Sequence, residues 1–244
     1  MNVCVIGCDG NMGRRYMAIL RMLEVEYAGV DLKPENRYYY SNLFTHFIIA
    51  TPTDTHAEIL HWLMDERPGR HRILVEKPVC KDAKEVANLA KKAEEGGHKV
   101  YMVNQYAYRG YSSRGGGGYG KTKTNLTLYD YYQSGSDGLA WDCIQLLHMA
   151  EGEIRLSNDS PVRACMINGR VYDSSHTDKL YVKMIRNFLA GDRKKYLWPI
   201  GDLVLAHKLA EIYSDWDTNE KCIDRGTGEI RINPIEKQML DVDR

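Results

Sequence analysis

Short apolar runs separated by segments of helical period fill the chain from residue 1 to about residue 103. Runs that are apolar throughout are typical of parallel strands buried on both faces, and the intervening helices supply the cover. We therefore predict an α/β fold built on a doubly wound parallel sheet of the Rossmann type. The predicted strands are residues 3–7, 25–31, 46–50, 72–76 and 99–103.

Local signals mark the helices between these strands. Thr55 and Glu58 have the spacing of a capping box, and Asp82 is placed to cap the following helix, which we expect to end at Gly96-Gly97. The first helix has one apolar face, made of Met12, Tyr16, Leu20 and Leu23. Residues 32–45 are too few for a crossover helix and a strand, which predicts a sheet smaller than a full dinucleotide fold.

The sequence changes character after this region, which predicts a second domain. Residues 106–120 are rich in tyrosine and glycine, and we interpret them as a flexible connector. Alternating polar and apolar residues then indicate an antiparallel strand at 123–132. Further strands are predicted at 162–167 and 169–173, with helices near 138–150, 177–190 and 202–214. The predicted divisions are a dinucleotide-binding domain at 1–105, the connector at 106–120, a smaller α+β domain at 121–216 and a polar tail at 217–244.

Composition excludes several classes of partner and site. The 33 Lys and Arg residues balance the 33 Asp and Glu residues, so we expect neither nucleic acid nor an acidic membrane as a partner. Six cysteines without CxxC pairs indicate reduced thiols rather than a metal site or a disulfide framework. We expect a soluble cytoplasmic protein, since no apolar run approaches the roughly 18 residues of a membrane span and no signal peptide precedes the first strand.

A glycine-rich turn joins the first predicted strand to the first helix. Residues 7–13 read GCDGNMG, and such glycines let the backbone approach a pyrophosphate at the positive helix end, although a tight structural turn also favours glycine. Asp31 ends the second strand, where a carboxylate binds both ribose hydroxyls or simply caps a turn. The acid favours NAD over NADP, and Lys33 and Arg37 blunt that preference.

Two further motifs end buried strands. Residues 48–56 read IIATPTDTH, and small side chains there either keep a ligand crevice open or only terminate the strand and cap a helix. Residues 73–78 read ILVEKP and place Lys77 at the carboxyl end of a strand, where ligands of open parallel sheets bind. Pro78 holds the backbone of Lys77 extended.

In this order, the glycine turn, ATPTDTH and VEKP resemble the glucose-fructose oxidoreductase and myo-inositol dehydrogenase family (Gfo/Idh/MocA), over residues 1 to about 105. The resemblance implies a Rossmann domain followed by an open-faced, mainly antiparallel sheet that holds a sugar, polyol or similar substrate. It implies that Lys77 bonds the substrate hydroxyl and helps move its proton. The cofactor-binding residues that it implies are Gly7, Gly10, Asn11, Met12, Gly13, Asp31, Ala50, Thr51, Pro52, His56, Glu76, Lys77 and Asn104.

The chain departs from the family pattern in the second domain. Aligning residues 143–147 with the family's segment puts Asp142 where a proton-shuttling histidine normally lies and Gln145 where an aspartate lies. Asp142 is either a carboxylate base or a capping or salt-bridged aspartate. His176 begins a predicted helix and is a further candidate to contact the substrate.

These features predict an NAD(P)-dependent oxidoreductase that moves a hydride between nicotinamide and a carbonyl or secondary alcohol of a small polar substrate. The missing histidine leaves an alternative, a nucleotide-binding sensor or assembly protein without hydride chemistry. The second domain is short, so we also expect a homo-oligomer formed through its sheet.

Overall fold

In the computed structural model the chain forms two compact units, and each is described by itself. Side chains are described in residues 2–31, 44–65, 70–105, 178–191, 197–204 and 207, and six further strands are described by their backbone alone. The first unit comprises Met1–Tyr108 and Asp178–Glu211, and the second comprises Arg109–Thr177 and Ile212–Arg244. The predicted connector, residues 106–120, lies outside the described residues.

A mostly parallel six-stranded sheet forms the centre of the first unit. Its strands are β1 (Val3–Ile6), β2 (Tyr27–Val30), β3 (His46–Ile49), β4 (Arg72–Val75), β5 (Lys99–Met102) and β10 (Trp198–Pro199). The order is β10-β5-β4-β3-β1-β2, with β10 alone antiparallel. The five predicted strands and the Rossmann-like α/β class are confirmed. The antiparallel edge strand β10 was not predicted, because a strand of two residues is too short to show a hydrophobic pattern.

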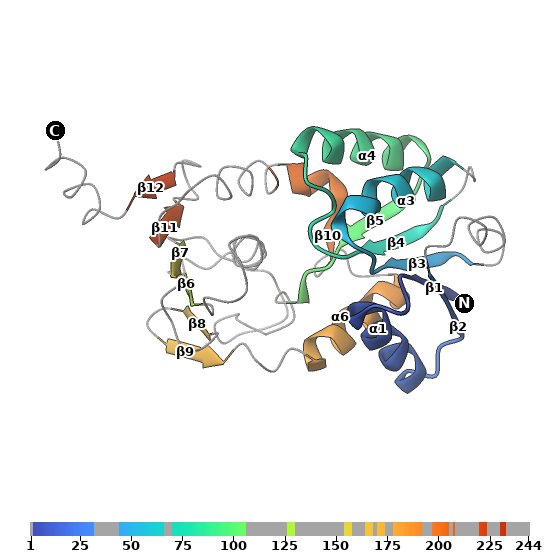
Figure 1. Cartoon of the computed structure of the whole chain (residues 1–244), viewed down its shortest axis with the longest axis horizontal. Helices are drawn as coiled ribbons and strands as arrows, with labels where there is room; N and C mark the ends of the chain where they lie inside the picture. Colours follow the sequence, from blue (N-terminus) through green and yellow to red (C-terminus); the bar gives the residue numbers. More distant parts are fainter. Residues whose placement is uncertain are drawn as a thin grey trace, which may run out of the picture. The chain divides into compact units, whose positions relative to one another are not determined.

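Helices cover both faces of this sheet (Figure 1). They are α1 (Asn11–Met22), α3 (Thr53–Asp65), α4 (Ala83–Glu95) and α6 (Asp178–Ala190), with a 3-10 turn η3 at Ile200–Asp202. The helices α3 and α4 lie on one face, and α1 and α6 pack together on the other. The helix α6 belongs to the first unit, although the sequence pattern predicts residues 177–190 in the second domain.

Alternating strand residues supply the core under α1 and α6. The apolar face of α6 completes this core, which explains why the helix joins the first unit. The buried residues of this cluster are Val3, Val5, Tyr16, Ile19, Leu20, Ile48, Leu74, Tyr101, Val103, Tyr181, Met184, Ile185, Phe188 and Leu197.

The ends of the helices follow the sequence signals with one exception. Asp82 caps α4 by accepting a hydrogen bond from the Lys84 backbone N–H at 2.7 Å, and Gly97 leaves that helix with φ of +71°, as predicted. The predicted start of α3 at Thr55 is wrong, since α3 begins at Thr53. The Thr55 hydroxyl instead donates a hydrogen bond to Thr51 Oγ1 at 2.7 Å. Threonine side chains often form such local hydrogen bonds near the start of a helix.

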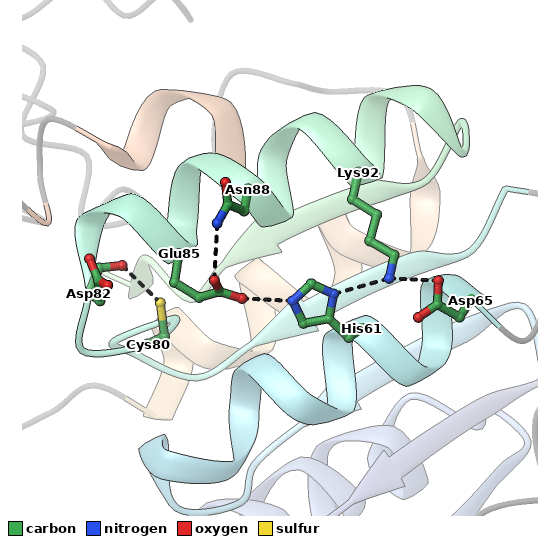
Figure 2. Close-up of polar contacts among 7 residues, drawn as sticks. All are labelled: His61, Asp65, Cys80, Asp82, Glu85, Asn88 and Lys92. Carbon is green, nitrogen blue, oxygen red and sulfur yellow. Dashed lines mark hydrogen bonds and ion pairs between the residues drawn. The ribbon is translucent and has the colours of Figure 1, made fainter.

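A chain of polar side chains links α3 to α4 (Figure 2). Lys92 Nζ lies 2.6 Å from an Asp65 carboxylate oxygen and donates to His61 Nδ1 at 3.0 Å. His61 Nε2 lies 2.7 Å from Glu85 Oε1, whose carboxylate also accepts from the Asn88 amide at 3.3 Å. Since Nδ1 accepts from a lysine, the neutral imidazole with its proton on Nε2 fits this chain.

The second unit contains its own six-stranded sheet. Its strands are β6 (Leu126–Tyr129), β7 (Ile154–Ser157), β8 (Ala164–Ile167), β9 (Arg170–Asp173), β11 (Glu220–Ile223) and β12 (Ile230–Ile232). The order is β12-β11-β7-β6-β8-β9, and the β6–β7 pair is parallel while the other pairs are antiparallel.

His46, the first residue of β3, should make the stability of the protein depend on pH. Burial, with the nearby charge of Arg72, lowers the pKa of His46 from 6.5 to about 4. Between these values the unfolded chain takes up a proton that the folded chain does not, so the free energy of unfolding should fall by about 2 kcal/mol as the pH decreases. Urea unfolding of wild type and H46Q at intervals from pH 6.5 to about pH 4 measures this loss. A slope that H46Q leaves unchanged would assign the effect to other groups.

Candidate functional site

The carboxyl ends of four parallel strands meet at one edge of the first sheet. The ladder continues one residue past the strands, because Ala50 N–H donates to Ile6 O at 2.8 Å and Glu76 N–H donates to Ile49 O at 2.9 Å. Val103 N–H donates to Val75 O at 2.9 Å in the same way. Strand order reverses between β1 and β3, and ligands of open α/β sheets bind at such a switch point.

The glycine turn after β1 is packed too closely for side chains at two positions. Gly7 has φ of +84°, and a Cβ there would lie 2.7 Å from Thr51 Cγ2. A Cβ on Gly13 would lie 2.1 Å from the Gly7 carbonyl oxygen. Gly10 differs, because its φ is −72° and its Cβ would come no closer than 3.4 Å to described atoms. Gly7 and Gly13 thus form the turn, and Gly10 is exposed at its surface.

The amino end of α1 has the properties of an anion site. Gly10 is the N-cap and provides no side-chain cap, and no acidic residue lies in the first turn, which begins with Asn11 and Met12. The first backbone N–H groups of a helix lack intrahelical partners and carry positive partial charge. This end of α1 therefore fits a pyrophosphate group.

Carboxylates flank the same turn on the side of β2. Asp31 is exposed directly after β2, and Asp9 accepts a weak 3.6 Å contact from the Cys8 thiol. Burial, and then the charges of Asp9 and Asp31, raise the pKa of Cys8. The thiol therefore stays protonated at neutral pH.

His56 joins the turn after β3 to the turn after β4. The side chain is 1% exposed, with Nδ1 2.8 Å from Pro78 O and Nε2 2.8 Å from Thr51 O. Both ring nitrogens thus lie against backbone carbonyls. Thr51 is buried, whereas Pro52 is exposed and Ala50 half-buried.

The turn after β4 is fixed by a buried carboxylate. Glu76 Oε2 accepts a hydrogen bond from the Lys77 backbone N–H at 3.1 Å, and Oε1 accepts a short one from the Tyr16 hydroxyl of α1. The peptide bond between Lys77 and Pro78 is cis. Lys77 itself is half-buried at the same edge of the sheet as the glycine turn.

Two buried amides follow β5. Asn104 is 1% exposed, and its side-chain nitrogen and oxygen have no hydrogen-bond partner among the described residues. Gln105 is 3% exposed, and its side-chain oxygen also has no hydrogen-bond partner within the part of the chain that the structure describes. Buried polar atoms are normally bonded, so this pair fits a ligand that supplies the missing partners.

The structure therefore brings the predicted residues of the first domain to one sheet edge. Asp142, Gln145 and His176 lie outside the described residues. Tyr16 and Gln105 were not predicted as parts of the site. Tyr16 was interpreted only as part of an apolar helix face, although its hydroxyl needs a partner when buried.

The described residues contain no group of His, Cys, Asp and Glu side chains that could hold a metal ion. Within the same residues, no helix is long and apolar enough to cross a membrane.

Comparison with protein-family models and with curated proteins gives no match. Solved structures do match over most of the chain. The WlbA (WbpB) dehydrogenase from Thermus thermophilus, in complex with NAD and UDP-GlcNAcA, is 15% identical with a TM-score of 0.63, covering 88% of this chain and 95% of that chain.

Two further structures extend this likeness. A putative myo-inositol dehydrogenase from Sinorhizobium meliloti has a TM-score of 0.67 at 13% identity, over 90% of this chain and 98% of that chain. A Gfo/Idh/MocA family oxidoreductase from Vibrio cholerae has a TM-score of 0.64 at 13% identity, over 86% of this chain and 96% of that chain. The chain thus shares the fold of these structures, with a Rossmann-like α/β sheet in its first unit. The predicted resemblance to the Gfo/Idh/MocA family is confirmed at the level of the fold.

The glycine turn yields a matched pair of substitutions. G13A should destabilise the chain by roughly 3 kcal/mol or more, because its methyl group collides with backbone. G10A should fold with less than about 1 kcal/mol of loss but should weaken dinucleotide binding, since its methyl group projects at the exposed amino end of α1. Thermal unfolding and NADH fluorescence titration measure the two effects. Unchanged NADH binding by folded G10A would contradict the placement of the pyrophosphate.

Proposed function

We propose that this protein is an NAD(P)-dependent oxidoreductase of the Gfo/Idh/MocA family. Its substrate is a sugar, polyol or related small polar molecule with a carbonyl or secondary alcohol. The observation that carries the proposal is that an uncapped, glycine-lined helix end and the Lys77 turn lie at the same edge of one parallel sheet.

NAD is the proposed cofactor, with NADP as a weaker ligand. The first turn of α1, with Gly7, Gly10 and Gly13, would hold the pyrophosphate, and Asp31 would accept hydrogen bonds from the adenosine ribose. The Thermus thermophilus structure that shares this fold contains NAD. The amides of Asn104 and Gln105 would bond to the bound cofactor, which supplies hydride chemistry at its nicotinamide ring.

Lys77 is the proposed catalytic residue. An ammonium group held on a fixed turn donates a hydrogen bond to the substrate oxygen and stabilises the negative charge that develops there during hydride transfer. Ala50, Thr51 and Pro52 would shape the floor beside the nicotinamide half. We propose that His56 holds this floor in place through its two carbonyl contacts.

The remaining residues predicted from the sequence belong to the second unit. We propose Asp142 as the carboxylate that accepts the substrate proton, with Gln145 and His176 contacting the substrate. The sheet of this unit would mediate homo-oligomer formation. The domain boundaries at residues 105 and 120 and a cytoplasmic location remain part of this proposal.

The decisive substitution is K77M, which removes the ammonium group and keeps the length of the side chain. Turnover should fall by about 100-fold or more, because the transition-state charge loses its hydrogen-bond donor, whereas the Kd for NADH should change by less than about threefold. Stopped-flow hydride transfer with a panel of sugars, polyols and their keto forms provides the measurement.

K84M is the matched control, since Lys84 is exposed on α4 and lies outside the proposed site. Tight NADH binding by the wild type without turnover on any substrate would contradict the enzyme and indicate nucleotide binding alone. Full activity of K77M would remove Lys77 from the mechanism.

Cofactor preference should depend on Asp31. D31N should weaken NADH binding about tenfold and strengthen NADPH binding about tenfold, since the carboxylate bonds ribose hydroxyls and repels a 2'-phosphate. Fluorescence titration with both cofactors measures the change. D9N provides the comparison, because Asp9 lies at the same turn and should affect both cofactors alike. Equal effects of D31N on the two cofactors would contradict the assignment of Asp31.

A further inference from the structure

We propose that Tyr16 is a positioning residue for Lys77 and acts through the carboxylate of Glu76. This inference rests on the proposed function, because Lys77 is the group whose placement matters. Tyr16 belongs to the helix that begins at the glycine turn, whereas Glu76 and Lys77 follow β4. The link therefore joins the predicted pyrophosphate site to the predicted catalytic turn.

The two oxygens of Glu76 have different partners. Oε1 accepts the Tyr16 O–H, and Oε2 accepts the Lys77 backbone N–H at 3.1 Å. Tyr16 is 0% exposed and Glu76 is 8% exposed, so water has little access to the pair. With one oxygen held by the hydroxyl, the carboxylate cannot rotate without breaking a buried hydrogen bond. Its other oxygen is thereby kept against the Lys77 amide.

Strand register explains why this contact forms. Leu74 belongs to the core under α1 and α6, and Glu76, two residues later, points to the same face of the sheet. Ala50 lies between the glycine turn and Glu76 in sheet order and has a small side chain. The tyrosine ring can thus reach from α1 across the end of β3 to the carboxylate.

Electrostatics keep the tyrosine a donor. Burial, and then the charge of Glu76, raises the pKa of Tyr16 well above its usual value, so the hydroxyl stays protonated. A buried carboxylate needs hydrogen-bond donors, and Tyr16 and the Lys77 amide supply one to each oxygen. A phenylalanine would fill the same space and leave Oε1 without this donor.

A second tyrosine packs against the ring of Tyr16. Tyr181 of α6 meets it edge-on, with centroids 6.0 Å apart, and the Arg15 guanidinium lies 5.2 Å from the Tyr181 ring centroid. Tyr181 is buried in the same core cluster as Tyr16. Y181F therefore makes the same chemical change in the same core and serves as the control.

The test measures the local reactivity of Lys77, which needs no known substrate. The full-length wild type, Y16F, Y181F and E76Q are acylated at low conversion with an amine-reactive ester, and labelled peptides are quantified by mass spectrometry. The rate at Lys77 is divided by the rate at exposed Lys84 in the same sample, which cancels global differences between samples. Thermal unfolding establishes that each variant is folded.

We expect the normalised labelling rate of Lys77 to rise about threefold or more in Y16F, since loss of one buried hydrogen bond frees the carboxylate and the amide that it holds. Y181F should leave this rate unchanged. E76Q should also raise it, because an amide can still accept the Tyr16 hydroxyl at its oxygen but presents an NH2 group to the Lys77 N–H.

An unchanged rate in folded Y16F would overturn the proposal, even if Y16F were less stable than the wild type. An equal rise in Y16F and Y181F would also overturn it, since core packing alone would then control the turn. If Y16F does not fold, the E76Q variant provides the test. An unchanged labelling rate of Lys77 in E76Q would then reject the proposal that the Glu76 carboxylate positions Lys77. The proposed function fails separately, if the wild type binds no NADH.

Discussion

The parallel hydrogen-bond ladder is the constraint on which the site depends. It continues beyond the strands through the N–H groups of Ala50, Glu76 and Val103, which donate to the neighbouring strand. The turns after β1, β3, β4 and β5 therefore leave the sheet at one edge, in a fixed register. The ladder alone therefore brings residues from distant parts of the sequence to the same edge.

Side-chain contacts then fix the turns relative to one another. The absence of a Cβ at Gly7 lets the first turn approach Thr51, and His56 connects the backbone at Thr51 to that at Pro78. The Tyr16 hydroxyl connects α1 to Glu76. The Tyr16–Glu76 and His56–Thr51 hydrogen bonds are buried, so breaking either one leaves a buried polar group without its partner. Contacts within the protein thus connect the turns at this edge of the sheet.

Four of the five predicted parallel strands, β1, β3, β4 and β5, are mostly buried, and their apolar runs are the signal of strands covered on both faces. The sequence also predicted the turns that the structure brings to one edge of the sheet. The two residues of β10 lack any periodic signal, and α6 was assigned to the wrong side of a boundary because an amphipathic pattern does not specify its partner. Tyr16 was missed for a related reason, since periodicity registers its apolar ring and not the hydrogen bond of its hydroxyl.

The polar groups at this edge fall into two sets with different roles. Glu76, Tyr16 and His56 have hydrogen-bond partners inside the protein, so they stabilise the turns and offer little to a ligand. The Asn104 amide has no partner among the described residues, and the amino end of α1 has no side-chain cap. An unsatisfied buried polar group costs about 1 to 3 kcal/mol. A dinucleotide that bonds to the Asn104 amide would remove this cost on binding, so the same amide that lowers stability in the free protein would increase affinity for the cofactor.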